Sequence, residues 1–371
     1  MPTSIPTLAT ERLILRPWRV EDFDWFAAAC ANPKVRQFIG GVQNRIDAWR
    51  TFAGMFGHWY LRGHGFWVLE RKDDGLPVGA LGVLRHETWP GTEIGWQLNP
   101  EHWGKGYATE GARAAQDWAF ATLPVESVIS CIDRGNIASQ QVAKRLGNVP
   151  GREITMTLGP ETFTSVIWEK TRAQWQSENR PAPAVTGTVE LKPIPTLETE
   201  RLILREWRRD DIAPALAFMA NEDVTRYTVG APQRPIDAWR GLATIVGHWY
   251  LRGYGFWAVE RKADRRYIGR IGLWNPEGWP GMEVGWTLGR DYWGQGYATE
   301  AARASMDYGF RNFDIPKLLS VIHVDNAPSQ AVAKRLGETR GPRTTIAFGG
   351  KTFEVDAWEI TREEWAARAR A

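Results

Sequence analysis

The sequence repeats itself once, at a shift of about 190 residues. Residues 10–16 (TERLILR) return as 199–205, residues 57–63 (GHWYLRG) as 247–253, and residues 144–147 (KRLG) as 334–337. A period of this length is too long for a solenoid and suits a whole domain. The sequence therefore predicts two tandem copies of one domain, at 1–176 and 196–371, joined by a proline-rich linker at 177–195.

Both copies have the same order of strand and helix patterns. Alternating apolar and polar residues predict strands, and apolar residues at three-to-four spacing predict helices. In the first copy, strands are expected at 12–16, 66–71, 78–84, 92–98, 125–132, 153–158 and 162–170. Helices are expected at 21–31, 45–61, from the glycine loop to 123, and at 138–146. The second copy repeats this order and adds a short helix at 363–371.

A glycine-rich loop joins a strand to a helix in each copy, with the sequences WGKGYATE at 103–110 and WGQGYATE at 293–300. Glycines allow a sharp turn and leave room for a ligand, and the first amides of a helix have no partner within it. Together these features predict a phosphate or pyrophosphate site. The loop of nucleotide-hydrolysing enzymes is excluded, because Lys105 is followed by Gly106 rather than Ser or Thr. The dinucleotide fingerprint is also out of register.

The loop resembles the pyrophosphate loop of the GNAT superfamily of acyl-CoA N-acyltransferases. Gly106 and Ala108, like Gly296 and Ala298, match the last two fixed positions of that loop, whereas Trp103 and Trp293 replace its first Arg or Gln. The form WGxGYATE is similar to the RimJ/RimL branch. The resemblance implies an α/β (α+β) fold, with a mixed, mostly antiparallel twisted sheet flanked by helices in each copy.

The resemblance also implies that acetyl-CoA is bound beside this loop and its neighbouring strand and helix. In the first copy the expected residues are Trp96, Gln97, Leu98, Trp103, Gly104, Lys105, Gly106, Tyr107, Ala108, Thr109, Asn136 and Lys144. In the second copy they are Trp286, Thr287, Leu288, Trp293, Gly294, Gln295, Gly296, Tyr297, Ala298, Thr299, Asn326 and Lys334.

Amide formation from a thioester needs an amine that has lost a proton and a proton for the leaving thiolate. Glu93 and Glu283 begin the strands before the glycine loops and are the candidate bases, acting directly or through water. The alternative is that each only binds the substrate amine or is solvated. Burial would raise the pKa of such a carboxyl toward neutrality.

The motif Asn-x-x-Ser follows the next strand in both copies. The resemblance implies that Asn136 and Asn326 bind the pantetheine or diphosphate arm, and that Ser139 and Ser329 lie near the sulfur and protonate the thiolate. Helix capping is the alternative for these residue types. Many relatives use a Tyr on this helix as the acid, but none occurs between 131 and 151, so water is another candidate.

Other reactive side chains are assigned structural roles. His58 and Arg62 share a helix face, as do His248 and Arg252. Each pair is expected to anchor its helix, and acid-base chemistry by the His is the alternative. Cys30 and Cys131 have no counterpart in the second copy, which argues against a disulfide framework and fits a reducing cytoplasm.

The composition excludes several classes of protein. A net charge of +3 predicts no nucleic-acid partner, and no apolar run is long enough to predict a membrane span. The N-terminus lacks a signal-peptide pattern, and no residue cluster has metal-ligand spacing. Trp89, Trp96, Trp279 and Trp286 are expected near the acceptor and favour flat or apolar groups.

The expected function is an acetyl-CoA-dependent N-acetyltransferase acting on a primary amine, either a protein N-terminus or a small molecule. Both copies keep the loop, the strand Glu and Asn-x-x-Ser. The alternatives are that one copy is a non-catalytic acyl-CoA-binding or scaffold module, or that the pair serves only interactions. The two domains are expected to pack as an intramolecular pseudo-dimer.

Overall fold

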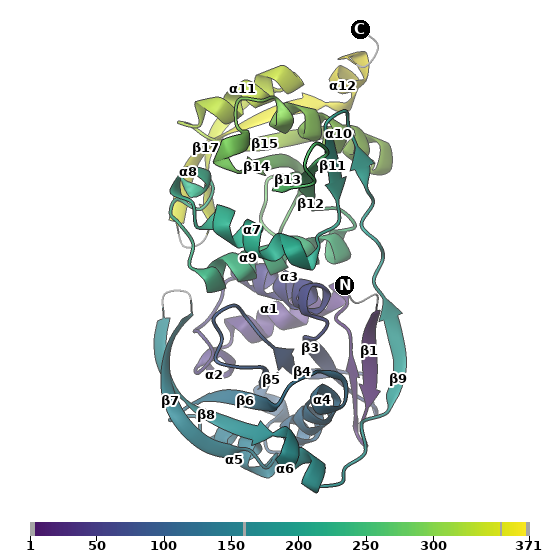
Figure 1. Cartoon of the computed structure of the whole chain (residues 1–371), viewed down its shortest axis with the longest axis vertical. Coiled ribbons are helices and arrows are strands. Elements are labelled where there is room, and N and C mark those ends of the chain that lie inside the picture. The colour runs from purple at the N-terminus through teal and green to yellow at the C-terminus, as the bar shows by residue number, and fades with distance from the viewer. Residues whose placement is uncertain (1–3, 159–160, 349–350, 369–371) are drawn as a thin grey trace. The chain divides into compact units, whose positions relative to one another are not determined.

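The computed structural model describes residues 4–158, 161–348 and 351–368 (Figure 1). The chain separates into two compact units, Met1–Lys192 and Pro193–Ala371. Each unit has its own sheet, with strand order β7-β8-β6-β5-β4-β3-β2-β1-β9 in the first and β10-β11-β12-β13-β14-β15-β17-β16 in the second. Among the pairings of described residues, β5–β6 and β14–β15 are parallel and the others are antiparallel. The predicted mixed, mostly antiparallel sheet flanked by helices is confirmed in both units.

The strands of the first unit are β1 (Ser4–Ala9), β2 (Leu13–Arg16), β3 (Phe66–Arg71), β4 (Pro77–Leu84), β5 (Glu93–Leu98), β6 (Ser127–Asp133), β7 (Val149–Leu158), β8 (Glu161–Thr171) and β9 (Val185–Glu190). Its helices are α1 (Phe23–Ala31), α2 (Pro33–Arg36), α3 (Arg45–Arg62), α4 (Tyr107–Thr122), α5 (Ile137–Arg145) and α6 (Arg172–Ser177).

The second unit repeats this order. Its strands are β10 (Leu197–Glu198), β11 (Leu202–Arg205), β12 (Phe256–Arg261), β13 (Tyr267–Trp274), β14 (Glu283–Leu288), β15 (Lys317–His323), β16 (Thr339–Phe348) and β17 (Lys351–Thr361). Its helices are α7 (Ile212–Met219), α8 (Glu222–Thr225), α9 (Pro235–Arg252), α10 (Tyr297–Asn312), α11 (Ala327–Leu336) and α12 (Arg362–Arg368). The helix predicted at 363–371 is α12, and residues 369–371 lie outside the described part.

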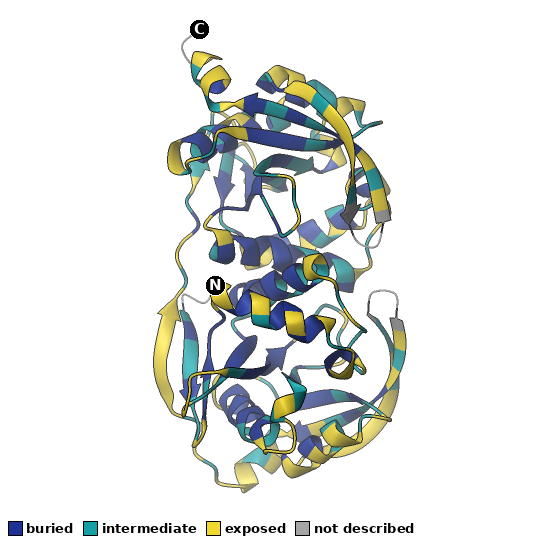
Figure 2. Cartoon of the chain, turned by 180° about the vertical axis from the view of Figure 1, so that it is seen from behind, coloured by how far each residue is buried: buried dark blue, intermediate teal, exposed yellow. Residues whose placement is uncertain are grey.

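Part of the segment predicted as a linker, 177–195, belongs to the first sheet. β9 pairs antiparallel with β1, and the two strands lie side by side at one edge of the sheet (Figure 1). Every residue of β9 is exposed, as Figure 2 shows, so the strand has no buried face, and its two valines, Val185 and Val189, are about half exposed. β1 was missed because a proline, Pro6, interrupts its short sequence, SIPTLA, although Ile5 and Leu8 are buried.

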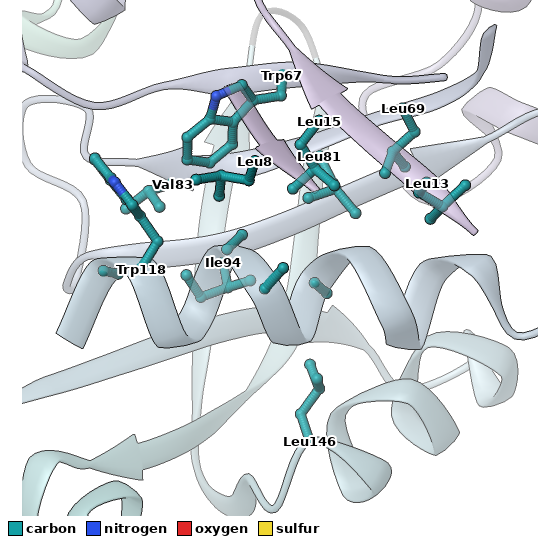
Figure 3. Close-up of a cluster of buried hydrophobic side chains, with 14 of the residues drawn as sticks. Leu8, Leu13, Leu15, Trp67, Leu69, Leu81, Val83, Ile94, Trp118 and Leu146 are labelled. Carbon is teal, nitrogen blue, oxygen red and sulfur yellow. The ribbon is translucent and has the colours of Figure 1, made fainter. Parts of the chain in front are cut away.

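The core of the first unit lies between its sheet and α4 (Figure 3). Ala112, Ala115 and Ala119 form a face of small side chains on α4 and are fully buried. A Cβ on Gly111 would lie 2.6 Å from the side chain of Leu69, so the glycine lets the helix approach the sheet closely. This packing fixes the start of α4 relative to the strands that precede it.

Candidate active site

The predicted glycine loop precedes α4 in the first unit and α10 in the second. Gly104 and Gly106 have φ angles of 74° and 84°, in the left-handed region that favours glycine. Gly106 is the N-cap of α4 and provides no side chain to accept the first helix amides. These amides have no acceptor within the helix, so they are available to an anion. Gly294 and Gly296 repeat the geometry, with φ angles of 72° and 81°.

A buttress holds the loop of the first unit in place. Oε1 of Glu110 accepts hydrogen bonds from Oγ1 of Thr10 at 2.6 Å and from the amide of Arg12 at 2.8 Å. Oε2 of Glu110 accepts from Nε of Arg12 at 2.7 Å, and the same guanidinium donates to the carbonyl of Lys105 at 3.0 Å. The first helical turn, the loop and the entry to β2 are therefore tied together.

The second unit has the same buttress. Glu300 accepts from Thr199 at 2.5 Å and from the amide of Arg201 at 2.8 Å, and Arg201 donates to the carbonyl of Gln295 at 2.9 Å. No role is predicted for these residues from the sequence. Their recurrence in both copies was the available signal, because the Thr-x-Arg and the Glu repeat together.

The residues predicted to bind the cofactor differ in what they can offer. Leu98 and Tyr107 are buried in the core, at 6% and 9% exposure, so only their backbone can reach a ligand. Trp103 is 49% exposed, and its indole donates to the carbonyl of Leu98 at 2.8 Å. Lys105 and its counterpart Gln295 are exposed on the loop. The open amides and exposed loop positions suit a diphosphate, and we regard the loop as a fit for CoA.

The Asn-x-x-Ser motif caps α5, as the helix-capping alternative predicted. Oδ1 of Asn136 accepts the amide of Ser139 at 3.1 Å, which leaves the Asn136 side-chain NH₂ free of this bond. Oγ of Ser139 accepts from the indole of Trp96 at 3.2 Å. Lys144 is exposed in the last turn of α5. The structure thus brings Trp96 and Ser139 together.

The second unit repeats this arrangement at α11. Asn326 accepts the amide of Ser329 at 3.2 Å, and Trp286 donates to Oγ of Ser329 at 3.2 Å. Lys334 is exposed, with its ammonium 5.8 Å from the centre of the Trp358 ring.

The parallel strands β5 and β6 pair only at Glu93↔Ile129 and then diverge. Beyond this pair, main-chain groups of the two strands form hydrogen bonds with side chains instead of with each other. The amide of Cys131 donates to Oε1 of Glu93 at 3.0 Å, and Oγ of Ser130 donates to the carbonyl of Ile94 at 2.7 Å. Glu93 therefore stabilises the point at which the sheet opens, in addition to any chemical role.

The second sheet opens in the same way. β14 and β15 pair at Glu283↔Leu319, the amide of Val321 lies 3.4 Å from Oε1 of Glu283, and Ser320 donates to the carbonyl of Val284 at 2.9 Å.

Burial raises the pKa of both candidate bases. The pKa of Glu93 rises to about 7, because desolvation outweighs the hydrogen bonds from Cys131 and from the indole of Trp89, which donates to Oε2 at 2.7 Å. The pKa of Glu283 rises to about 8, with Trp279 in the place of Trp89 and with Arg270 opposing the shift. Both carboxyls therefore change charge near neutral pH.

The base and acid candidates lie on different faces of the sheet. Side chains alternate along a strand, so Glu93 and Trp96 point to opposite faces of β5, and Ser139 lies on the Trp96 side. No hydrogen bond joins Glu93 to Ser139 in the described ranges. An amine beside Glu93 on one face and a thiol beside Ser139 on the other face would meet at the opening between β5 and β6.

His58 anchors its helix, as expected. It is buried, its Nδ1 lies 2.8 Å from the carbonyl of His64, and its Nε2 accepts the amide of Arg85 at 3.0 Å. Burial holds the pKa of His58 well below its usual range. Arg62 forms an ion pair with Glu87. His58 therefore serves the fold rather than proton transfer.

The two cysteines are not reactive thiolates. Burial raises the pKa of Cys30 to about 11, and burial together with Glu93 raises the pKa of Cys131 well above its usual range. Among the residues that the structure describes, no three His, Cys, Asp or Glu side chains are placed to hold a metal ion. Within the same residues, no helix has both the length and the apolar character needed to cross a bilayer.

Comparison with known proteins gives a consistent result. The sequence profile described as "Acetyltransferase (GNAT) domain" matches residues 12–149 and again 201–339. The uncharacterized N-acetyltransferase p20 of Bacillus licheniformis is 29% identical over 176 residues, which cover 46% of this chain and 98% of that protein.

Two further relatives have informative names. The FsC-acetyl coenzyme A-N(2)-transacetylase of Aspergillus fumigatus is 31% identical over 157 residues, covering 38% of this chain and 64% of that protein. Among solved structures, an acetyltransferase from Agrobacterium tumefaciens is 32% identical, with a TM-score of 0.41 over 46% of this chain and 96% of that one.

Proposed function

Because this chain belongs to the GNAT family of acetyltransferases, with one such domain in each unit, we propose that each unit transfers an acetyl group from acetyl-CoA to a primary amine. The observation that carries the proposal is found in both units. A helix start whose amides have no acceptor within the helix accompanies a partly buried Glu whose pKa lies near neutrality.

The donor is acetyl-CoA, which supplies the acetyl thioester. The GNAT family uses this donor, and the name of the Aspergillus fumigatus relative includes acetyl coenzyme A. The amides at the start of α4, from Tyr107 to Thr109, would hold the diphosphate, with Lys105 adding positive charge and Asn136 offering its side-chain NH₂.

Glu93 takes the proton of the amine, directly or through water. The neutral nitrogen then forms a bond to the acetyl carbon, and the bond from that carbon to sulfur breaks. The thiolate receives a proton from Ser139 or from water, and the second proton of the attacking nitrogen, lost as the amide forms, replaces the proton that this donor gave up. Trp96 holds the Ser139 hydroxyl by donating to its oxygen. Glu283, Ser329 and Trp286 take the same roles in the second unit.

The acceptor is a primary amine of a small molecule or of a protein N-terminus. Trp89 and Trp279 donate to the two candidate bases, so an acceptor amine at Glu93 or Glu283 would lie beside an indole ring. This placement favours acceptors with flat or apolar groups.

A second candidate is that one unit transfers acetyl groups and the other only binds acyl-CoA. The favouring observation is that the exposed loop cation Lys105 of the first unit is replaced by Gln295 in the second, which removes one charge from the phosphate site. The pseudo-dimer arrangement and the cytoplasmic location stay predictions.

Calorimetric titration of the full chain with acetyl-CoA tests the proposal. We expect two equivalents to bind per chain, and one equivalent for each of Gly106→Trp and Gly296→Trp, because the indole fills the loop. One equivalent in the unmodified chain would support the second candidate. No binding would refute both. Release of free thiol with a panel of amines then tests transfer itself.

A further inference from the structure

The two units differ at one position on the strand next to the candidate base. β13 carries Arg270 where β4 of the first unit carries Ala80. The positions are equivalent, because Ala80 pairs with Gln97 on β5 and Arg270 pairs with Thr287 on β14.

Arg270 is a partly buried cation without an ion-pair partner among the described residues. Its guanidinium lies over the Phe256 ring, 5.3 Å from the ring centre, and within the described residues it forms neither a hydrogen bond nor a salt bridge. A guanidinium has five N–H donors, and a buried donor that lacks an acceptor costs free energy. Burial lowers its pKa, and the charges of Tyr267 and Glu283 oppose this shift. A guanidinium keeps its proton in proteins, so Arg270 is a cation.

Arg270 lines a small pocket between α7, α8 and the sheet. The side chains that share this pocket include Phe218, Thr225, Thr228, Tyr267 and Thr287. No carboxylate is among the described residues that line the pocket, and Arg270 is the charged one among them. The other walls offer hydroxyl groups, the amide of Gln233 and apolar surface to an anionic ligand.

The pocket and Glu283 belong to the same face of the sheet. In the register of β13 and β14, Arg270 is opposite Thr287, Gly272 is opposite Gly285, and Trp274 is opposite Glu283. Residues two apart on a strand share a face, so Arg270 and Glu283 face the same side.

Between Arg270 and Glu283, this face of the sheet has two glycines, Gly272 and Gly285, in place of large side chains. Four residue steps place the backbone of Arg270 about 13 Å from the pair that contains Glu283. A Cβ on Gly285 would lie 2.9 Å from the Phe256 ring and 3.5 Å from Oε1 of Glu283. The Phe256 ring therefore lies between the guanidinium and the candidate base, and the Trp274 ring packs against it with the ring centres 5.3 Å apart.

We propose that the second unit acetylates an amine that also carries a carboxylate, with the carboxylate on Arg270, the carbon chain on Phe256 and the amine at Glu283. A guanidinium fork binds a carboxylate through two parallel hydrogen bonds, which meets the unsatisfied donors. This inference rests on the proposed function, and it makes the acceptors of the two units different.

The first unit cannot bind the carboxylate in this way. Ala80 occupies the strand position of Arg270. Among the positions equivalent to the pocket residues, Arg36 on α2 is a cation, and its Nε donates to the carbonyl of Gly41 at 2.8 Å. In the second unit Thr225 occupies the position of Arg36. The first unit is therefore expected to accept amines that lack an anionic group.

The transfer test uses the full chain and ω-amino acids of two to six carbons, each compared with its own carboxamide. We expect at least one acid to be acetylated with a kcat/KM roughly 10- to 100-fold higher than that of its amide. Arg270→Ala and Arg270→Gln should each remove this preference, so that each acid and its amide are used at similar rates. The control is Arg311→Ala, at an exposed arginine near the end of α10. Equal use of acid and amide, or a preference that survives both variants, would overturn the proposal.

A second readout does not depend on transfer. Phenylglyoxal modifies arginine, and mass spectrometry locates the modified residue. We expect 6-aminohexanoate, but not hexylamine, to protect Arg270 in the full chain. Protection without transfer would retain the carboxylate site and refute the proposed enzyme function. Absence of protection by every ω-amino acid would refute the site, whatever the transfer activity.

Discussion

At the scale of single residues, Glu93 and Glu283 join a structural role to a chemical one. Each carboxylate accepts an indole N–H, and Oε1 of each faces a main-chain amide of the next strand, where the sheet opens. A group held in this way cannot turn away from the opening. The burial that fixes it also raises its pKa toward the pH at which a base is most useful.

The pH dependence of turnover follows from these two pKa values. Only the ionised carboxylate accepts a proton, so kcat/KM should rise with pH, through about 7 for the first unit and about 8 for the second. Glu283→Gln should leave the profile centred near the lower value, and Glu93→Gln near the higher one. The double variant should lose about 10²- to 10⁴-fold in rate. Initial rates measured from pH 5.5 to 9.5 check this.

The control for that experiment is Glu101→Gln, because the Glu101 side chain is 63% exposed and lies outside the site. A double variant with the rate and profile of the unmodified chain would rule out the base assignment.

Glu338 should make the second unit less stable as the pH rises. It is 4% exposed, its Oε1 lies 2.9 Å from Oγ of Ser320, and its Oε2 has no partner within the described residues. Burial raises its pKa from 4.5 to about 8, so the folded state favours the protonated form. Its contribution to stability is complete below about 4.5 and is lost as the pH rises through about 8. Glu338→Gln should remove this loss.

Hydrogen exchange of the full chain, followed by mass spectrometry of peptides covering 317–338, measures this effect between pH 5 and 9, after correction for the intrinsic exchange rate. The equivalent peptides of the first unit serve as the control, because Asn148 replaces Glu338 there and accepts from Gln116 at 2.8 Å. The same pH dependence in Glu338→Gln as in the unmodified chain would contradict the prediction.

At the scale of elements, the loop and its helix depend on glycines at positive φ. Gly106→Ala should destabilise the first unit by about 1–2 kcal/mol, because Ala resists the left-handed region. It should also weaken acetyl-CoA binding at the first site, because its Cβ would lie 3.3 Å from Nη2 of Arg12 and displace the buttress. Calorimetry measures the binding, and urea unfolding measures the stability.

The matched control is Gly63→Ala. Gly63 has a φ of 77° at the end of α3, and a Cβ there would meet nothing within 4 Å. The two variants should lose similar stability, but only Gly106→Ala should lose affinity. Equal affinities would show that the loop conformation does not set acetyl-CoA binding.

The sequence predicted elements well where the signal was local. The helix expected at 45–61 is α3, which begins after the capping side chain of Asn44 and ends at Gly63. The strand expected at 66–71 is β3 with the same bounds. The glycine loop and the strand Glu could also be found, because their neighbours in sequence are their neighbours in space.

Features that depend on distant residues were not predictable in this way. The buttress joins Thr10 and Arg12 to Glu110, about a hundred positions later in the chain. β9 is recognisable only through its partner β1. The pocket around Arg270 needs three elements to be folded against one another before the missing acceptor is apparent.

At the scale of the whole molecule, the first unit extends beyond the predicted boundary at 176. Lys170 is 1% exposed, and its ammonium donates to Glu178 at 2.5 Å and to the carbonyl of Leu146 at 2.8 Å. Arg180 forms an ion pair with the buried Asp117. Residues after 176 therefore neutralise two buried charges, and β9 covers the edge of β1.

A fragment that ends at 176 should consequently be less stable than one that ends at 192. Removal of one partner from a buried ion pair costs about 3–5 kcal/mol, so the difference should be at least that large. Urea unfolding of the fragments 1–176 and 1–192, followed by tryptophan fluorescence, measures it. Coincident unfolding midpoints would show that the segment 177–192 does not stabilise the unit.

The duplication also has a genetic consequence. When two identical subunits associate, one codon change alters every site in the assembly. Here each site has its own codons, so Ala80 and Arg270 were free to diverge while the sites stayed at a fixed ratio of one to one. A mutation in one half of the chain therefore leaves the site in the other half unchanged, and every molecule of the variant contains both sites.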